Sequence, residues 1–367
     1  MFFRNLLENS SFDEDKIVPY VLFPLDARWL YYEVERKLLN RGRPELWKNL
    51  KRNEFLVAVP EPRQYSEMRP LLLSCAFDLH LHDRGSIGFP AEIQLPASPE
   101  APLFGRTGSE STCIANINER AWSTLKTNWT LAGTRAGQDA KKLARQLAAV
   151  CVAICHSPAY ETEHKESLAQ DWAHIPIPRD RTKFLQLAQA GATVAVLLDP
   201  LKSASGAIKE ILPNSSVQFG IVERTDGKSV TTADLAVEYS FFGAAVGGWR
   251  HRPTEPTELP NAALGESTGD LFINDRVCLR NVPKSVWEYQ LGGYPVIKKW
   301  LGYRDRGRRG DKPLSVQEMN HLRNMVQRIA ALLVFHSTLD QLYEAASDHS
   351  FTVDELTESN KTAEVQD

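Results

Sequence analysis

The stretch Leu314–Leu333, LSVQEMNHLRNMVQRIAALL, predicts the strongest single element of the fold. Ser315 and Glu318 have the spacing of a capping box, in which each side chain satisfies a free backbone amide at a helix start. Apolar residues then recur at helical spacing, and polar residues such as Arg328 fall on the other faces. We therefore predict a long helix over residues 315–343 with a narrow apolar seam made of Met319, Leu322, Val326, Ile329 and Leu333.

Two further helices are expected upstream of the long one. A helix over 139–156 has an apolar face, ends before Pro158, and carries Lys141, Lys142 and Arg145 on its other faces. Its apolar residues are Leu143, Leu147, Val150 and Ile154. Another helix is predicted to start after Asp180, a residue type favoured at the N-cap.

Runs rich in β-branched and aromatic residues predict strands between these helices. Residues 17–59 read as strand followed by helix, and residues 66–95 as several strands. Later candidates are VQFGIVE (217–223), DLAVEYSFF (234–242) and DLFINDRVCL (270–279), and TDGK at 225–228 carries an Asp-Gly hairpin signal. The expected class is α+β, with mixed sheets and a long C-terminal helix.

Composition allows a sizeable core, because 43% of the 367 residues are hydrophobic and 24% are charged. No apolar run is long enough to span a membrane, and no secretion signal is visible, so a cytoplasmic protein is expected. The five cysteines favour reduced thiols over a disulfide framework. The segment 344–367 is acidic and is expected to be a mobile tail; without it, 42 basic and 39 acidic residues leave a net charge of +3.

The densest basic cluster is YRDRGRRGDK, residues 303–312. It has five positive and two negative charges, and its two glycines let the backbone approach a partner closely. The guanidinium fork matches phosphate oxygens, so the cluster suits phosphate contact. A solvated loop before the long helix explains the same residues equally well.

Signatures of catalysis and metal binding are weak. The chain has no phosphate-binding P-loop, no dinucleotide-binding glycine motif and no nucleophile elbow. His80, His82 and Asp83 could suggest metal ligands on one strand face, but no further ligands stand at a suitable spacing. Cys151 and Cys155 fall on the apolar helix face and are interpreted as core. We expect no catalytic residues, no metal and no cofactor.

Four segments together resemble the C-terminal region of type ISP and related single-chain restriction–modification enzymes. They appear in the family's order: FPLDARWLYYE (23–33), SCAFDLHLHDRGSIGFPAEI (74–93), ICHSPAYETEHKESLAQDWAHIPIP (154–178) and VWEYQLGGYPVIKKWLGYRDR (286–306). The last two are similar to family patterns over about 20 residues each. Trp172, Ala173 and His174 depart from the usual Phe, Pro and Arg of the third pattern.

The resemblance implies a module that recognises a duplex DNA sequence on behalf of an adenine-N6 methyltransferase or restriction subunit. In the family, catalytic domains precede this region, and we expect this chain to carry none of them and to have no enzymatic activity alone. The expected organisation is a junction remnant at 1–60, recognition lobes at 61–178 and 179–313, a spacer helix at 314–343 and the tail at 344–367. A metal-dependent nuclease and a partner-binding structural subunit remain alternatives.

Recognition of DNA needs cations that contact phosphates and side chains that reach base edges. The predicted phosphate contacts are Lys141, Lys142, Arg304, Arg306, Arg308, Arg309 and Lys312. The polar loop 105–118 offers Arg106, Asn116 and Asn118 as candidates for contact with bases.

Overall fold

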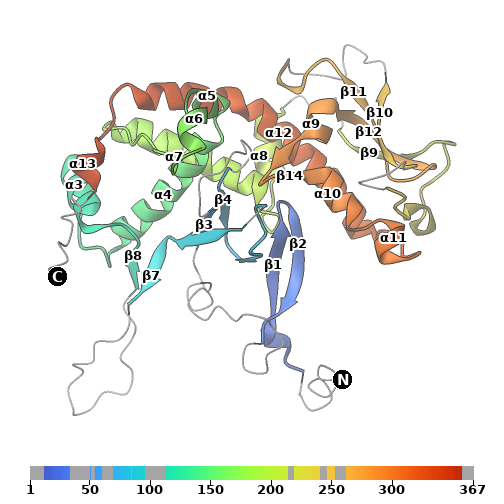
Figure 1. Cartoon of the computed structure of the whole chain (residues 1–367), viewed down its shortest axis with the longest axis horizontal. Helices are drawn as coiled ribbons and strands as arrows, with labels where there is room; N and C mark the ends of the chain where they lie inside the picture. Colours follow the sequence, from blue (N-terminus) through green and yellow to red (C-terminus); the bar gives the residue numbers. More distant parts are fainter. Residues whose placement is uncertain are drawn as a thin grey trace.

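The computed structural model describes residues 12–33, 50, 54–59, 69–83, 85–95, 113–213, 219–239, 246–252 and 262–357 of the chain. Long helices cross the upper part of the molecule, a four-stranded sheet lies at one end, and small sheets lie below the helices (Figure 1). The predicted α+β class is confirmed.

The longest helix, α12 (Val316–Ser347), begins where the sequence predicts it. The Ser315 hydroxyl accepts a hydrogen bond from the Glu318 amide at 3.1 Å, and the Glu318 carboxylate accepts one from the Ser315 amide at 2.9 Å. The capping box is therefore confirmed. The five predicted apolar residues pack inward, since four are buried and Leu333 is half-buried against the core. The buried surface is wider than the predicted narrow seam, because Met325, Ala330, Ala331 and Leu332 are buried as well.

Helix α7 (Arg181–Leu198) packs against both α12 and α4 (Gln138–Cys155). The Asp180 carboxylate caps α7 as predicted, since it accepts a hydrogen bond from the Thr182 amide at 2.7 Å. At the crossing with α4, a Cβ on Gly191 would lie 1.8 Å from the Ala149 carbonyl oxygen. Only glycine lets these two helices approach so closely, and the expected lobe boundary at 178/179 falls between them.

Arg328 lies on a face of α12 other than the apolar seam, as predicted, but it is buried there as well. Its guanidinium donates to the carbonyl oxygens of Val196 at 2.8 Å, Leu197 at 3.2 Å and Asp199 at 3.0 Å. These carbonyls end α7 and have no partner within that helix. Arg328 thereby satisfies the carboxyl end of α7 and joins it to α12.

Shorter helices and turns complete the helical part. They are η1 (Glu14–Lys16), α3 (Glu119–Trp129), α5 (Pro158–Glu163), α6 (Lys165–Leu168), α8 (Ser205–Ile211), η2 (Thr232–Leu235), η3 (Ala262–Leu264), α9 (Lys284–Glu288), α10 (Val296–Gly302), α11 (Arg306–Arg309) and α13 (Val353–Leu356). Pro158 ends α4 as expected and at the same time starts α5, whose N-cap is Ser157.

The largest sheet is antiparallel, with the strand order β10 (Gly248–Arg252), β11 (Thr268–Phe272), β12 (Val277–Pro283) and β9 (Ile221–Arg224). The predicted strand 270–279 is in fact a hairpin of β11 and β12 around Asn274. The predicted strand 234–242 is wrong over its described part, because residues 232–235 form η2 and only Val237 makes an isolated bridge, to Asp305.

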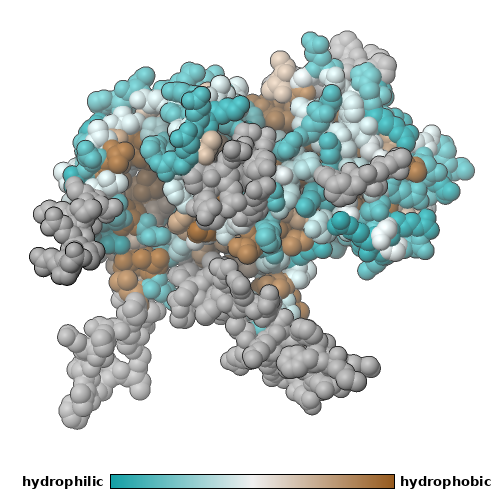
Figure 2. Space-filling model, viewed as in Figure 1, coloured by the Kyte–Doolittle hydropathy of each residue, from teal (hydrophilic) through white to brown (hydrophobic). Residues whose placement is uncertain are grey.

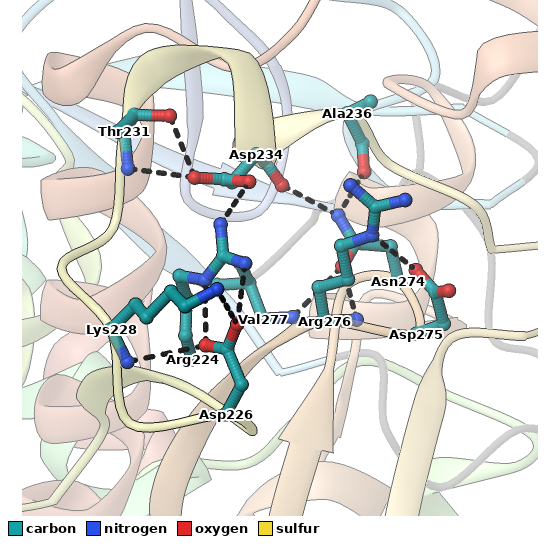
Figure 3. A network of polar contacts seen from close by, with 10 residues as sticks. All are labelled: Arg224, Asp226, Lys228, Thr231, Asp234, Ala236, Asn274, Asp275, Arg276 and Val277. Atoms are coloured by element: carbon teal, nitrogen blue, oxygen red, sulfur yellow. Dashed lines mark hydrogen bonds and ion pairs between the residues drawn. The ribbon is translucent and has the colours of Figure 1, made fainter.

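The Asp-Gly turn at 225–228 exists, but it does not join two strands of a hairpin, since β9 pairs with β12. Figure 3 shows the reason. Arg224 pairs with both Asp226 and Asp234, and these pairs fold the segment back on itself. Asn274 donates to the carbonyl oxygens of Asp234 and Ala236, both at 2.7 Å. Ion pairs and hydrogen bonds of side chains therefore hold this segment, in place of backbone hydrogen bonds between strands.

The remaining sheets are small. They contain β1 (Ile17–Phe23) with β2 (Asp26–Tyr31) and β5 (Ala76–Phe77); β3 (Phe55–Ala58) with β4 (Leu71–Leu73) and β6 (Ile87–Pro90); β7 (Glu92–Gln94) with β8 (Cys113–Ala115); and β13 (Gln290–Leu291) with β14 (Tyr294–Pro295). Strands β1 and β2 form an antiparallel hairpin, and β5 joins β1 in parallel. The helix expected after the first strand falls largely outside the described residues.

Residues 349–356 pack onto the body, although the sequence suggested a mobile tail from residue 344. The Phe351 amide donates to the Ile177 carbonyl at 2.9 Å, and Arg179 pairs with Glu355. The Asn118 amide group, which caps α3, donates to the Leu356 carbonyl at 3.0 Å. The end of α12 is thus connected to α3 at the left of Figure 1. Residues 358–367 lie outside the described residues.

Candidate nucleic-acid interface

The predicted basic cluster lies on the connection between α10 and α12, at the lower right of Figure 1. Asp305 organises it: one carboxylate oxygen accepts from the Gly307 amide at 2.9 Å and caps α11, and the other accepts from the Tyr239 amide at 2.8 Å. The Arg306 amide donates to the Val237 carbonyl at 2.9 Å. The connection is therefore a built structure fastened to residues 235–239.

Arg304 points inward. It is 9% exposed, its guanidinium lies 3.8 Å from the centre of the Trp300 ring, and it donates to Asp26 at 2.7 Å. Asp26 is fully buried. This ion pair joins the first resemblance segment to the fourth. Because its charge is used inside the protein, we leave Arg304 out of the candidate contact surface.

Arg306 and Arg309 are paired with acidic side chains. Arg309 donates to both carboxylate oxygens of Glu318, at 2.8 and 3.0 Å. Burial alone would raise the pKa of Glu318, but hydrogen bonds from Arg309 and the Ser315 amide outweigh it and lower that pKa to about 2. Arg306 is exposed and pairs with Asp311 and, at 3.5 Å, with Glu238. Arg309 therefore supports the start of α12, whereas Arg306 sits at the surface.

Arg308 and Lys312 are exposed, and within the described ranges neither makes an ion pair. The Arg308 guanidinium lies 4.8 Å from the centre of the Tyr303 ring. These two residues are the members of the predicted cluster whose charge is available to a partner.

Three of the other predicted residues, Lys141, Lys142 and Asn116, lie at the opposite end of the molecule, near β7, β8 and α4 (Figure 1). Lys141 lies 3.2 Å from Glu92, whereas Lys142 is exposed and has no ion-pair partner in the part of the chain that the structure describes. Asn116 is exposed and its side-chain amide donates to the Pro90 carbonyl at 2.8 Å. Arg106 lies outside the described residues.

Sequence patterns missed two cations that the fold brings beside the cluster. Arg28 of β2 and Lys299 of α10 lie 5.7 and 5.6 Å from the centre of the same Tyr303 ring that Arg308 faces. Arg28 is more than 270 residues from Arg308 in the chain, so no local charge count could join them. The available signal was that Arg28 and Lys299 both fall inside resemblance segments.

The end of the molecule that carries α11 has a polar surface on the face shown in Figure 2. Hydrophilic residues cover the four-stranded sheet and α11 there, whereas apolar patches lie around β7 and β8 at the lower left and in the lower centre near β1 and β2. None of the helices in the described residues is long and apolar enough to cross a membrane.

His80 and His82, which the sequence suggests as possible metal ligands, do not share a metal site among the described residues. His82 is buried; one ring nitrogen lies 3.0 Å from the Ser86 hydroxyl and the other 3.0 Å from the Arg69 carbonyl. His80 is exposed, and no strand holds the two histidines on one face. Among the described residues, no three histidine, cysteine or acidic side chains are grouped to hold a metal ion.

A model of the Type ISP C-terminal specificity domain matches residues 3–332 of the chain. The chain belongs to this family. The family predicted from the four segments is therefore confirmed. No curated protein sequence matches this specificity domain significantly.

Two solved structures have a similar fold. The specificity domain is similar to a chain of the cryoEM structure of a DrdV–DNA complex, with a TM-score of 0.56 and 15% identity over 90% of this chain and 29% of that one. It is also similar to the ATP-dependent Type ISP restriction-modification enzyme LlaBIII bound to DNA, with a TM-score of 0.51 and 13% identity over 93% of this chain and 20% of that one. The specificity domain spans less than a third of each.

Proposed function

We propose that this chain is the duplex-DNA recognition module of a restriction–modification system. Its membership in the specificity-domain family is the observation that carries the proposal, and the two similar structures are both described as bound to DNA. Methyl transfer and cleavage would come from a methyltransferase or restriction part outside the matched region. We further propose that the protein acts in the cytoplasm, where it meets DNA.

The available cations suggest how a duplex would be held. Arg308 and Lys312 at one end and Lys142 at the other have exposed charges without carboxylate partners in the described residues. Such cations contact phosphates and set the position of a protein on DNA, whereas side chains in the grooves read the bases. We keep Arg306 as a peripheral phosphate contact and Arg106 and Asn116 as candidate base contacts.

A binding assay with duplex DNA tests the proposal. The full chain should shift a random-sequence duplex at low salt, and its affinity should fall steeply as salt rises, by on the order of a thousandfold between 50 and 200 mM if about six phosphates are contacted. No cleavage of plasmid DNA should occur with magnesium when the chain is alone.

The assignment as a recognition module needs a second measurement. Combined with the methyltransferase part of its own system, the chain should determine which sequence is methylated. If the methylated sequence is the same with and without this chain, the proposed function is wrong. Binding that is insensitive to salt would also contradict it.

A further inference from the structure

Four residues from three separate elements form one surface feature, which we name the Tyr303 cluster: Arg28, Lys299, Tyr303 and Arg308. The three cations lie 5.7, 5.6 and 4.8 Å from the centre of the Tyr303 ring, and Tyr303 as a whole residue is 38% exposed. Lys299 also lies 4.1 Å from the centre of the Tyr294 ring. The electron-rich ring faces attract cations, so Tyr303 can hold three like charges close together.

The cluster is supported from the interior. The Tyr303 ring centre lies 5.2 Å from that of Phe23, which is buried at the end of β1. Next to it along the chain, Arg304 pairs with Asp26, and Asp26 also pairs with Arg28 at 2.9 Å. The hairpin β1–β2 and the α10–α11 connection are thereby fixed against each other, and the three cations keep their relative positions.

The cluster carries excess positive charge. Among the described residues, Asp26 is the carboxylate within ion-pair distance of its cations, and that group is buried and shared with Arg304. Asp78 and Asp83 lie near Tyr294, whose pKa is raised mainly by burial and further by these two carboxylates. Neither carboxylate forms an ion pair with a cluster cation within the described ranges. The three cations share one buried carboxylate, so part of their mutual repulsion is left over. An anion bound at the surface beside them would offset that repulsion.

We propose that the Tyr303 cluster contacts the phosphate backbone of duplex DNA and does not read bases. This inference rests on the proposed function and places its contact surface. Cations lie close around the exposed Tyr303 ring, so a base could not stack freely on it, and contact must come through charge. The guanidinium groups of Arg28 and Arg308 suit phosphate oxygens in particular. Trp29 follows Arg28 in β2 and therefore points to the opposite face of the strand, so its ring does not belong to the Tyr303 cluster.

The test compares two triple variants of the full chain with equal charge change. The first is Arg28→Gln, Lys299→Gln and Arg308→Gln. The matched control is Arg120→Gln, Lys165→Gln and Lys209→Gln, three exposed cations of α3, α6 and α8 for which the described residues show no ion pair. Binding to A·T-rich and G·C-rich random duplexes is measured over a range of salt concentrations.

Each phosphate contact contributes about 0.9 to the slope of log K against log salt. The cluster variant should therefore show a slope smaller by about two to three, and at low salt an affinity lower by about tenfold or more, equally on both duplexes. The control should keep a slope within about one of the parent.

Three results would overturn the proposal. If the cluster and control variants behave alike while the parent binds, the contact surface lies elsewhere and the proposed function stands. A loss confined to one base composition means that the cluster reads sequence. If the parent binds no duplex at any salt concentration, the proposed function and this inference both fail.

A second variant guards against misfolding, because Arg28→Gln removes one ion pair of the buried Asp26. Lys299→Gln with Arg308→Gln leaves both ion pairs of Asp26 intact. Its melting temperature should match that of the parent, and its salt slope should still fall by about two. An unchanged slope in this folded double variant would also overturn the assignment.

Discussion

At the scale of single residues, the partner of a charge decides what the charge can do. Arg304 and Arg308 are four residues apart in one basic run, yet the first pairs with buried Asp26 and the second faces solvent beside an aromatic ring. The composition of the run predicted a positive surface. It could not separate these roles, because Asp26 lies nearly 280 residues upstream.

Removal of Asp26 should destabilise the fold. In Asp26→Asn, Arg304 keeps its charge in the interior and loses its principal partner, so the free energy of unfolding should fall by about 3 kcal/mol. Urea unfolding at neutral pH measures the change. The matched control, Asp275→Asn, breaks an exposed pair with Arg276 and should cost less than about 1 kcal/mol. Equal losses in the two variants would contradict the importance of the buried pair.

At the scale of elements, helices were easier to predict than strands. Periodicity and capping residues located α4, α12 and the start of α7 to within a few residues, because both signals are local. The segment after β9 has the composition of a strand but folds back instead, because Arg224 and Asn274 satisfy its polar groups. Those contacts join residues that are 10 to 40 positions apart in the sequence, so no local pattern reveals them.

The crossing of α4 and α7 gives a prediction at the same scale. Gly191→Ala should lower the free energy of unfolding by about 3 kcal/mol, because the new Cβ meets the backbone of Ala149, which cannot rotate away. The control, Gly206→Ala in α8, has open space around its Cβ and should change stability by less than about 1 kcal/mol. Thermal unfolding of both variants measures the two changes in stability. A Gly191→Ala protein as stable as the parent would mean that the helices can separate at little cost.

At the scale of the whole molecule, buried histidines in the resemblance segments contact distant parts of the fold. His156, at the end of α4, lies 2.9 Å from the Pro70 carbonyl, and His82 packs beneath the glycine turn at 292–293. The sequence identified these segments as a family pattern. The contact between His82 and Gly292 brings the second and fourth of these segments together in the interior.

These histidines predict how stability depends on pH. Burial lowers the pKa of His82 and His336 to about 4 and that of His156 to about 3, below the usual value of 6.5. The unfolded chain therefore binds protons first as pH falls, and stability present above pH 6.5 is lost toward pH 4. Between pH 7 and 5 the free energy of unfolding should fall by up to about 1.4 kcal/mol per pH unit for each histidine.

Urea unfolding at several pH values measures this slope. Carboxylates with a lowered pKa, such as Glu318, Glu355 and Asp234, lose their contribution at more acidic pH and so do not interfere in this window. A stability that is constant or rises from pH 7 to 5 would be inconsistent with histidines buried in the neutral form.

The ion pair between Asp26 and Arg304 has a practical consequence for exchanging target specificity between relatives. A chimera joined after residue 60 would take its first hairpin from one parent and its α10–α11 connection from the other. Such a hybrid would have to match Phe23 to a foreign Tyr303 and Asp26 to a foreign Arg304, across an interface that each parent optimised alone. A junction placed before Ile17 transfers both halves together, so the hairpin should travel with the module that it supports.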